Sequence, residues 1–166
     1  MKVRQNPSLT ELNTFGISAN AGLLYEIETE EDLLSLPPFD PARDLLLGGG
    51  SNIVLISDIP GAVYLNRING IAIIDEKPGR ILVEAGAGEN WHGLVRWSVE
   101  RGLAGLENLS LIPGTIGAAP VQNIGAYGVE IAGLVERVSA WDWGHGRWAS
   151  FSRDECRFGY RDSLFK

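Results

Sequence analysis

The residues best suited to bind a ligand form a short motif of consecutive glycines followed by a serine and an asparagine. The motif consists of Gly48, Gly49, Gly50, Ser51 and Asn52. Glycines allow several backbone N–H groups to turn toward one anion, and the serine and asparagine side chains add hydrogen bonds. The chemistry that this predicts is phosphate binding. A plain glycine-rich turn is the alternative, since short motifs of this kind also occur by chance.

The glycine motif differs from the two common nucleotide-binding loops. A Rossmann fingerprint opens a helix, whereas the apolar run Ile53–Ile56 follows here. A Walker loop needs a lysine directly after its last glycine, and this motif has none. Because Leu45–Leu47 and Ile53–Ile56 both look like short buried strands, we expect the loop to lie between two strands, without a helix dipole.

A second stretch, from Ile112 to Gly128, is rich in small residues and nearly free of charge. Small side chains let the backbone lie against a flat ligand, and its two prolines restrict the conformations of the segment. A structureless segment of this length in a compact domain is usually functional. A Gly/Ala packing segment is the alternative. We expect this stretch and the glycine motif to converge on one ligand.

Composition excludes several classes of protein. The chain has 166 residues, is 45% hydrophobic and carries a net charge of −7, so it can bury a core but has no basic surface for nucleic acid. One cysteine, Cys156, and two histidines provide neither a disulfide framework nor a zinc cluster, so we predict no metal. With no apolar run near about 18 residues and no leader, we expect a cytoplasmic protein without membrane contact.

The apolar pattern predicts one longer helix and two short ones. A helical period over Glu89–Arg101 places Trp91, Leu94, Val95, Ser98 and Val99 on one face, and Gly102 is its expected stop. Capping boxes that begin at Thr29 and Ser152 each predict a short helix.

Short strands and tight turns are expected over the rest of the chain. The expected strands are Leu24–Ile27, Leu45–Leu47, Ile53–Ile56, Ala62–Leu65, Ile71–Ile74, Ile81–Ala85, Leu134–Trp143 and Trp148–Phe151. The expected turns are Pro60-Gly61, Asn69-Gly70, Pro78-Gly79 and Gly144–Gly146. Cross-strand contacts are expected among Trp141, Trp143 and Trp148.

Five motifs in a fixed order carry a family resemblance. They are NTFGI (Asn13–Ile17), GGGSN (Gly48–Asn52), GAGENWH (Gly86–His92), GLENLSLIPGTIGAAPVQNIGAYG (Gly105–Gly128) and ECRFGYRDSLFK (Glu155–Lys166). Together they resemble the UDP-N-acetylenolpyruvoylglucosamine reductases, in the longer type I form. Five ordered motifs are a far more specific signal than one glycine loop.

The resemblance implies an α+β fold of the vanillyl-alcohol-oxidase (PCMH) type, in which FAD lies between two lobes. The lobes would be residues 1–67 and residues 68–166. NADPH would be the hydride donor, UDP-N-acetylglucosamine enolpyruvate the substrate, and the protein a monomer. Since the family's proton-donating serine lies in later segments, we expect this chain to stop before the substrate-binding lobe and to be inactive alone. A non-catalytic FAD-binding module and another flavin oxidase of this fold are the alternatives.

The resemblance also assigns site residues. Its cofactor contacts fall on residues 48–52 and on the second stretch. The contacts in that stretch would be Pro113, Gly114, Thr115, Gly117, Ala118, Ala119, Gln122, Asn123 and Gly125. Ala118 and Ala119 stand where the family commonly has glycine or serine, so a hydroxyl contact is not expected from them.

The catalytic and substrate-binding residue that the resemblance assigns is Arg161, in FGYRDS, which would stabilise the enolate-like intermediate. Tyr127, in GAYG, would lie on the substrate side of the flavin. From the residues alone, an ion pair with Asp162 or another acid is the alternative for Arg161, and loop packing is the alternative for Tyr127.

Overall fold

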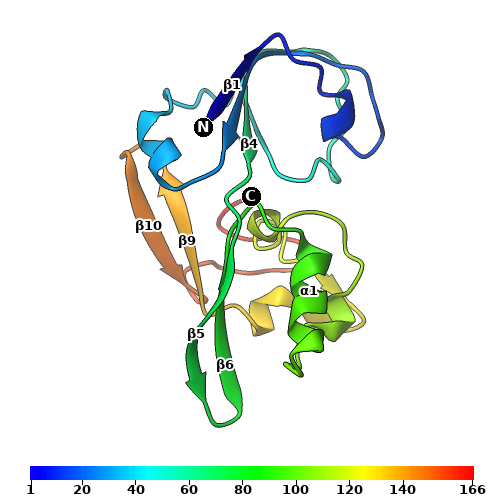
Figure 1. Ribbon diagram of the computed structural model, residues 1–166, viewed down its shortest axis with the longest axis vertical. Coiled ribbons are helices and arrows are strands. Elements are labelled where there is room, and N and C mark those ends of the chain that lie inside the picture. Colours follow the sequence, from blue (N-terminus) through cyan, green and yellow to red (C-terminus); the bar gives the residue numbers. More distant parts are fainter.

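The computed structural model describes residues 1–166, which form one four-stranded sheet, three two-stranded hairpins and a single α-helix (Figure 1). The strands are β1 (Lys2–Gln5), β2 (Ala21–Ile27), β3 (Leu45–Leu47), β4 (Ile59–Asn66), β5 (Ile71–Lys77), β6 (Arg80–Ala85), β7 (Gly125–Ala126), β8 (Val129–Glu130), β9 (Arg137–Asp142) and β10 (Arg147–Ser152). The α-helix is α1 (Trp91–Glu100), and the 3-10 helices are η1 (Thr10–Leu12), η2 (Glu31–Ser35), η3 (Glu107–Leu109), η4 (Ile116–Ala118) and η5 (Ile131–Gly133). None of the helices is long and apolar enough to span a membrane.

The four-stranded sheet has the order β1-β2-β4-β3, in which β4 pairs in parallel with both neighbours and β1 is antiparallel to β2. Its central strand β4 is apolar on both faces. Val63 and Leu65 pack into one cluster, with Leu24 and Leu47, whereas Tyr64 packs into another on the opposite face. A strand that is buried on both faces has a continuous apolar sequence, which is why a strand could be predicted here from the sequence.

The segment after the glycine motif is a crossover connection, so the expected strand Ile53–Ile56 is wrong. Leu47 in β3 pairs in parallel with Leu65 in β4, and the chain must therefore travel back along the sheet between them. Leu55 is buried in the sheet's core, while Ile56 is 94% exposed. The expected turn at Pro60-Gly61 is also wrong, because both residues lie within β4.

The helix α1 organises the second half of the chain. Asn90 caps it by accepting a hydrogen bond from the Gly93 N–H at 2.8 Å, and Gly102 ends it with a positive φ of 71°. Trp91 and Leu94 pack into a core cluster with Leu109, Ala119, Ile124 and Ile131. The predicted helix and its stop are confirmed, although Val99 is 53% exposed and lies outside the packed face.

Two smaller expectations about turns have mixed outcomes. Pro78-Gly79 closes the β5–β6 hairpin as expected, but Asn69-Gly70 does not join a hairpin, because β4 and β5 belong to different sheets.

Both capping boxes form their hydrogen bonds: the Thr29 N–H donates to Asp32 at 3.1 Å and the Ser152 N–H to Glu155 at 2.8 Å. The first opens the 3-10 helix η2 and the second opens only a turn, so neither starts an α-helix.

The β9–β10 hairpin and the residue that follows β9 pack against the N-terminal part of the chain. Trp141 and Trp148 face each other across it at 5.9 Å between ring centroids, as expected. Trp143 instead packs against Phe39 and Tyr64 of the first half, and the hairpin rises beside the segment that holds η2 in Figure 1. One core cluster lies within residues 9–65 and another within residues 91–131, and the division into lobes at residues 67 and 68 stays a prediction.

Candidate functional site

The glycine motif and the second stretch lie in direct contact. A Cβ atom on Gly48 would lie 2.5 Å from Oγ1 of Thr115, and one on Gly49 would lie 3.3 Å from the Cα of Gly114. A Cβ on Gly114 would in turn lie 3.3 Å from Oγ of Ser51. Any side chain at these positions would separate the two segments, so glycine is what permits the contact.

The backbone of both segments carries free hydrogen-bond donors. The N–H groups of residues 48–52, and those of Gly114 and Thr115, donate to no backbone carbonyl of the chain. Successive N–H groups that point outward from a glycine-rich turn form a concave site for an anion such as a phosphate. The cradle of glycines and the free donors therefore fit a diphosphate group.

A third segment holds the second stretch in place. The N–H of Gly117 donates to the carbonyl of Ala87 and that of Ile116 to Glu89, both at 2.9 Å, and the Trp91 N–H donates to Gly114 at 3.1 Å. A Cβ on Gly117 would lie 2.7 Å from the Cβ of Ala87. The segment that precedes α1 thus acts as a support, and it fixes the backbone that faces the glycine motif.

A fourth segment supports the glycine motif from the other side. Gly50 has a positive φ of 63°, and a Cβ there would strike the carbonyl of Leu12. The Thr14 N–H donates to the Gly50 carbonyl at 3.0 Å. The Asn13 side chain, 7% exposed, donates to the Leu9 and Ile17 carbonyls and accepts from the Ile17 N–H. Asn13 therefore shapes the loop against which Gly50 packs.

Arg161 lies at the far end of the second stretch and forms no ion pair. Its guanidinium donates to the Gly125 carbonyl at 2.7 Å and more weakly to the Asn123 carbonyl at 3.5 Å. None of the ion pairs, in which a cationic nitrogen lies within 4.0 Å of a carboxylate oxygen, involves Arg161 or Asp162. The alternative of an ion pair with Asp162 is therefore wrong in this structure, and the positive charge is not neutralised by the chain.

The expected site residues differ in how much of each side chain faces solvent. Ala119 and Asn123 are 2% and 1% exposed, so they shape the segment from behind. Pro113 and Ala118 are exposed, and Asn52 donates through Nδ2 to Gln122 at 3.3 Å, which links the two stretches again. Tyr127 is 89% exposed and has a positive φ of 51°, in the turn between β7 and β8. This exposure overturns the packed-loop alternative for Tyr127.

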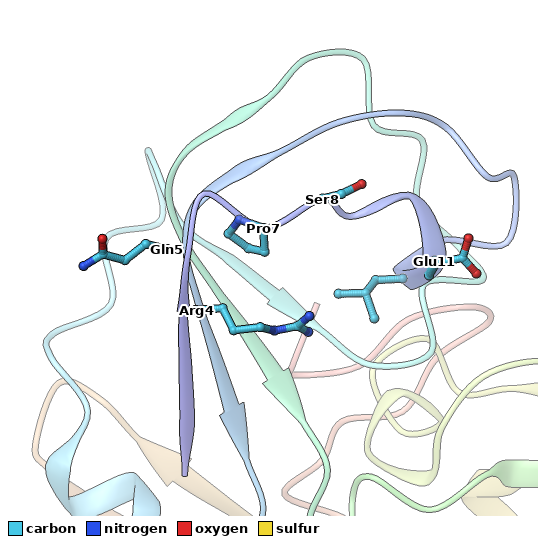
Figure 2. A pocket seen from close by; sticks show the side chains of 6 residues that line it. Arg4, Gln5, Pro7, Ser8 and Glu11 are labelled. Atoms are coloured by element: carbon cyan, nitrogen blue, oxygen red, sulfur yellow. The ribbon is translucent and has the colours of Figure 1, made fainter.

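Two hollows on the surface lie away from this contact. One is lined by Glu26, Glu28, Arg67 and Asn69. The other, about 590 Å³, lies beside β1 and η1, where Arg4, Ser8 and Glu11 surround it (Figure 2). Small-molecule pockets are lined mainly by apolar side chains, and Leu12 is the one hydrophobic residue lining the second hollow. The glycine contact is thus the stronger candidate, although it forms an open surface between loops.

Residues 40–148, more than half of the chain, match the family described as "FAD binding domain". The chain belongs to this FAD-binding family. The match includes both glycine-rich segments, which is consistent with a flavin nucleotide as the ligand of their free N–H groups. The predicted FAD-binding fold and FAD as the cofactor of the family are thereby confirmed.

Individual relatives of this FAD-binding chain bear one name. The whole chain is 46% identical to "UDP-N-acetylenolpyruvoylglucosamine reductase" of Dechloromonas aromatica (strain RCB), and the match covers 49% of that relative. The protein of that name from Escherichia coli (strain K12) is 46% identical over 97% of this chain and 48% of the relative. The chain spans about half the length of the curated relatives it matches.

A solved structure agrees with these relatives. The crystal structure of UDP-N-acetylenolpyruvylglucosamine reductase (MurB) from Thermus caldophilus superposes with a TM-score of 0.77 at 29% identity. The superposition covers 98% of this chain and 57% of the crystallised chain. The resemblance drawn from the five motifs is therefore confirmed.

Sequence reasoning missed the residues that hold the site from behind. Asn13 and Ala87 lie inside two of the five motifs, but no role was predicted for them. Glu130, which accepts a hydrogen bond from the Asn123 side chain at 2.8 Å, was not singled out. The only signal for Asn13 and Ala87 was their place within the ordered motifs, and Glu130 lies outside all five.

Proposed function

We propose that this chain supplies the FAD-binding part of a UDP-N-acetylenolpyruvoylglucosamine reductase. When bound, FAD would carry a hydride from NADPH to one carbon of the enolpyruvyl double bond of UDP-N-acetylglucosamine enolpyruvate, and an acid would protonate the adjacent carbon, giving UDP-N-acetylmuramate. The observation that carries the proposal is the contact between the two glycine-rich segments, because their free N–H groups match the diphosphate of such a cofactor. We further propose a cytoplasmic monomer, in which the buried Cys156 thiol takes no part.

In this proposal residues 48–52, Gly114 and Thr115 hold the diphosphate through backbone N–H groups. The remaining predicted contacts, Pro113, Gly117, Ala118, Ala119, Gln122, Asn123 and Gly125, supply the shape of the surface that the flavin would lie against. The buried members act through their backbone, since Asn123 is 1% exposed and Ala119 is 2% exposed. Absence of bulk at these positions, rather than side-chain chemistry, is what the cofactor requires.

Arg161 and Tyr127 are proposed to face the substrate. The Arg161 guanidinium keeps several N–H donors beyond those that bind the Gly125 and Asn123 carbonyls. It cannot lose its charge at neutral pH, and its planar donors match a carboxylate. It is therefore suited to bind the enolpyruvyl carboxylate and to stabilise negative charge that develops beside it.

A flavin titration of the 166-residue chain tests the proposal. FAD should bind with one site per chain, and NADPH should bleach the flavin absorbance. In a protein that also carries the substrate-binding lobe, UDP-N-acetylglucosamine enolpyruvate should then perturb the flavin spectrum, and Arg161→Lys should weaken that response about tenfold, because a charge-assisted hydrogen bond is lost.

The matched control is Arg157→Lys. Arg157 is also exposed, has a similar positive φ of 49° against 51° for Arg161, and lies in the same segment. A folded chain that takes up no FAD would refute the proposal. FAD uptake without any response to the UDP-sugar, when the substrate-binding lobe is present, would favour the non-catalytic binding module instead.

A further inference from the structure

The Asn123 side chain is buried beside the candidate site, and both its Nδ2 and its Oδ1 are hydrogen-bonded. The residue is 1% exposed and has a positive φ of 43°, a conformation that asparagine tolerates better than most residues. Its Nδ2 donates to Glu130 at 2.8 Å and to the Gly159 carbonyl at 2.9 Å, and its Oδ1 accepts from the Ala132 N–H at 3.1 Å. One amide group therefore joins three separate segments of the chain.

Glu130 and Arg161 flank the same glycine. A Cβ on Gly125 would lie 3.0 Å from Cγ of Glu130 and 3.3 Å from Nη1 of Arg161. The two opposite charges are thus close neighbours across a residue without a side chain. They nevertheless form no ion pair, because the Glu130 carboxylate binds Asn123 and the Arg161 guanidinium binds backbone carbonyls.

We propose that Asn123 is a positioning residue that keeps the Glu130 carboxylate away from Arg161. Without the amide, Glu130 would be free to turn toward the nearest cation, and its negative charge would compete with a substrate carboxylate for the guanidinium. The inference rests on the proposed function, since it assigns the free charge of Arg161 to the substrate. It adds that a partly buried hydrogen bond, from Asn123 to Glu130, keeps that charge free.

The Asn123 and Arg161 backbones support this view. Both adopt positive φ values, 43° and 51°, and residues other than glycine enter this region at a cost. The turn that carries Arg161 is closed by hydrogen bonds in both directions between Gly159 and Asp162, at 2.9 and 3.2 Å. Because Asn123 binds the Gly159 carbonyl at the base of this turn, one side chain fixes both the arginine and its competitor.

The test compares Asn123→Gly with the double variant Asn123→Gly/Glu130→Gln in the chain without cofactor. Glycine keeps the positive φ accessible while it removes the amide. The readouts are the rate at which phenylglyoxal modifies Arg161, measured by peptide mass spectrometry, and the Arg161 Nε–H signal in the NMR spectrum. Arg157, modified in the same sample, is the internal control.

In Asn123→Gly the modification rate of Arg161 should fall by about two- to fivefold, the range that a partly exposed ion pair gives. High salt should reduce the difference, because it screens the new pair. The double variant should restore the wild-type rate and NMR signal, since glutamine carries no charge. An unchanged rate in Asn123→Gly, or a double variant as slow as the single one, overturns the proposal.

If Asn123→Gly does not fold, Asn123→Ala replaces it in both variants, because alanine also removes the amide and adds no charge. The same outcomes then apply. Neither FAD nor substrate enters this test, so its failure leaves the reductase proposal standing. Conversely, a chain that passes this test but takes up no FAD refutes the proposed function alone.

Discussion

Replacing Gly49 by alanine tests whether the contact between the glycine-rich segments binds the cofactor. Gly49 is exposed and does not have a positive φ, so alanine can adopt its backbone conformation. The new Cβ would lie 3.3 Å from the Gly114 Cα and 3.5 Å from its carbonyl carbon. Carbon atoms pack best at about 3.5–4.0 Å, so the two segments must separate by a few tenths of an ångström.

The expected cost falls on ligand binding and leaves folding nearly unchanged. Alanine restricts the unfolded chain and thereby stabilises the fold by about 0.4–1 kcal/mol, which offsets much of the mild clash. A hydrogen bond to a charged group is worth about 1.5–3 kcal/mol, and about 1.4 kcal/mol is a factor of ten in affinity. Misalignment of one N–H with the diphosphate should therefore weaken FAD binding about tenfold or more.

Flavin fluorescence titration gives the affinity, and thermal unfolding of the chain without FAD gives the stability. The matched control is Gly133→Ala, since a Cβ on Gly133 would meet nothing within 4 Å and its φ is not positive. It should bind FAD as the wild type does. Wild-type affinity in a folded Gly49→Ala, or an equal loss in Gly133→Ala, would show that this contact is not the cofactor site.

Two further predictions concern stability. Trp91→Phe removes the buried hydrogen bond from Nε1 to the Leu109 carbonyl, 2.8 Å long, and should cost about 2–4 kcal/mol in a urea titration, whereas Trp148→Phe, 41% exposed, should cost under about 1 kcal/mol. Equal costs would contradict the packing of α1. Burial, followed by the nearby charge of Asp44, raises the pKa of Tyr64 from 10.0 to about 12. Because the folded-state pKa is the higher one, stability is fully present below about pH 10 and falls by roughly 1–3 kcal/mol as the pH rises toward 12. Urea titrations across this pH range should show the loss of stability. Tyr64→Phe should abolish the loss, and the control Tyr160→Phe, at an exposed tyrosine, should not. If the stability of Tyr64→Phe still fell with pH, the loss would belong to another group.

The glycine motif could be recognised from sequence because its requirement is local. Three consecutive glycines between apolar runs have few explanations, and each glycine marks a place where a side chain would block a contact, as the Gly48–Thr115 and Gly49–Gly114 approaches show. The helix at Trp91 was also readable, since its period and its stop lie within a dozen residues. The order of the five motifs then linked segments that no local pattern joins.

The elements that sequence reasoning misplaced depend on distant pairing. Ile53–Ile56 has a strand's composition, but the register of Leu47 with Leu65 makes its segment a crossover, and that register is set by residues far along the chain. The role of Glu130 was hidden for the same reason. Its partner Asn123 is fixed by bonds to Gly159 and Ala132, and such a set of partners leaves no periodic pattern in the sequence.

The position of α1 is a reason why the proposed site would use loop N–H groups instead of a helix N-terminus. Phosphate sites often lie at the start of a helix, where unpaired N–H groups and the dipole favour an anion. Here the Trp91 N–H donates to the Gly114 carbonyl and the Gly93 N–H to the Asn90 side chain, so those donors are already bound by protein. The helix instead orients the second stretch against the glycine motif, and the donors that we propose for the anion are those of residues 48–52, Gly114 and Thr115. A backbone site of this kind tolerates many side-chain changes around it but few additions of a Cβ within it.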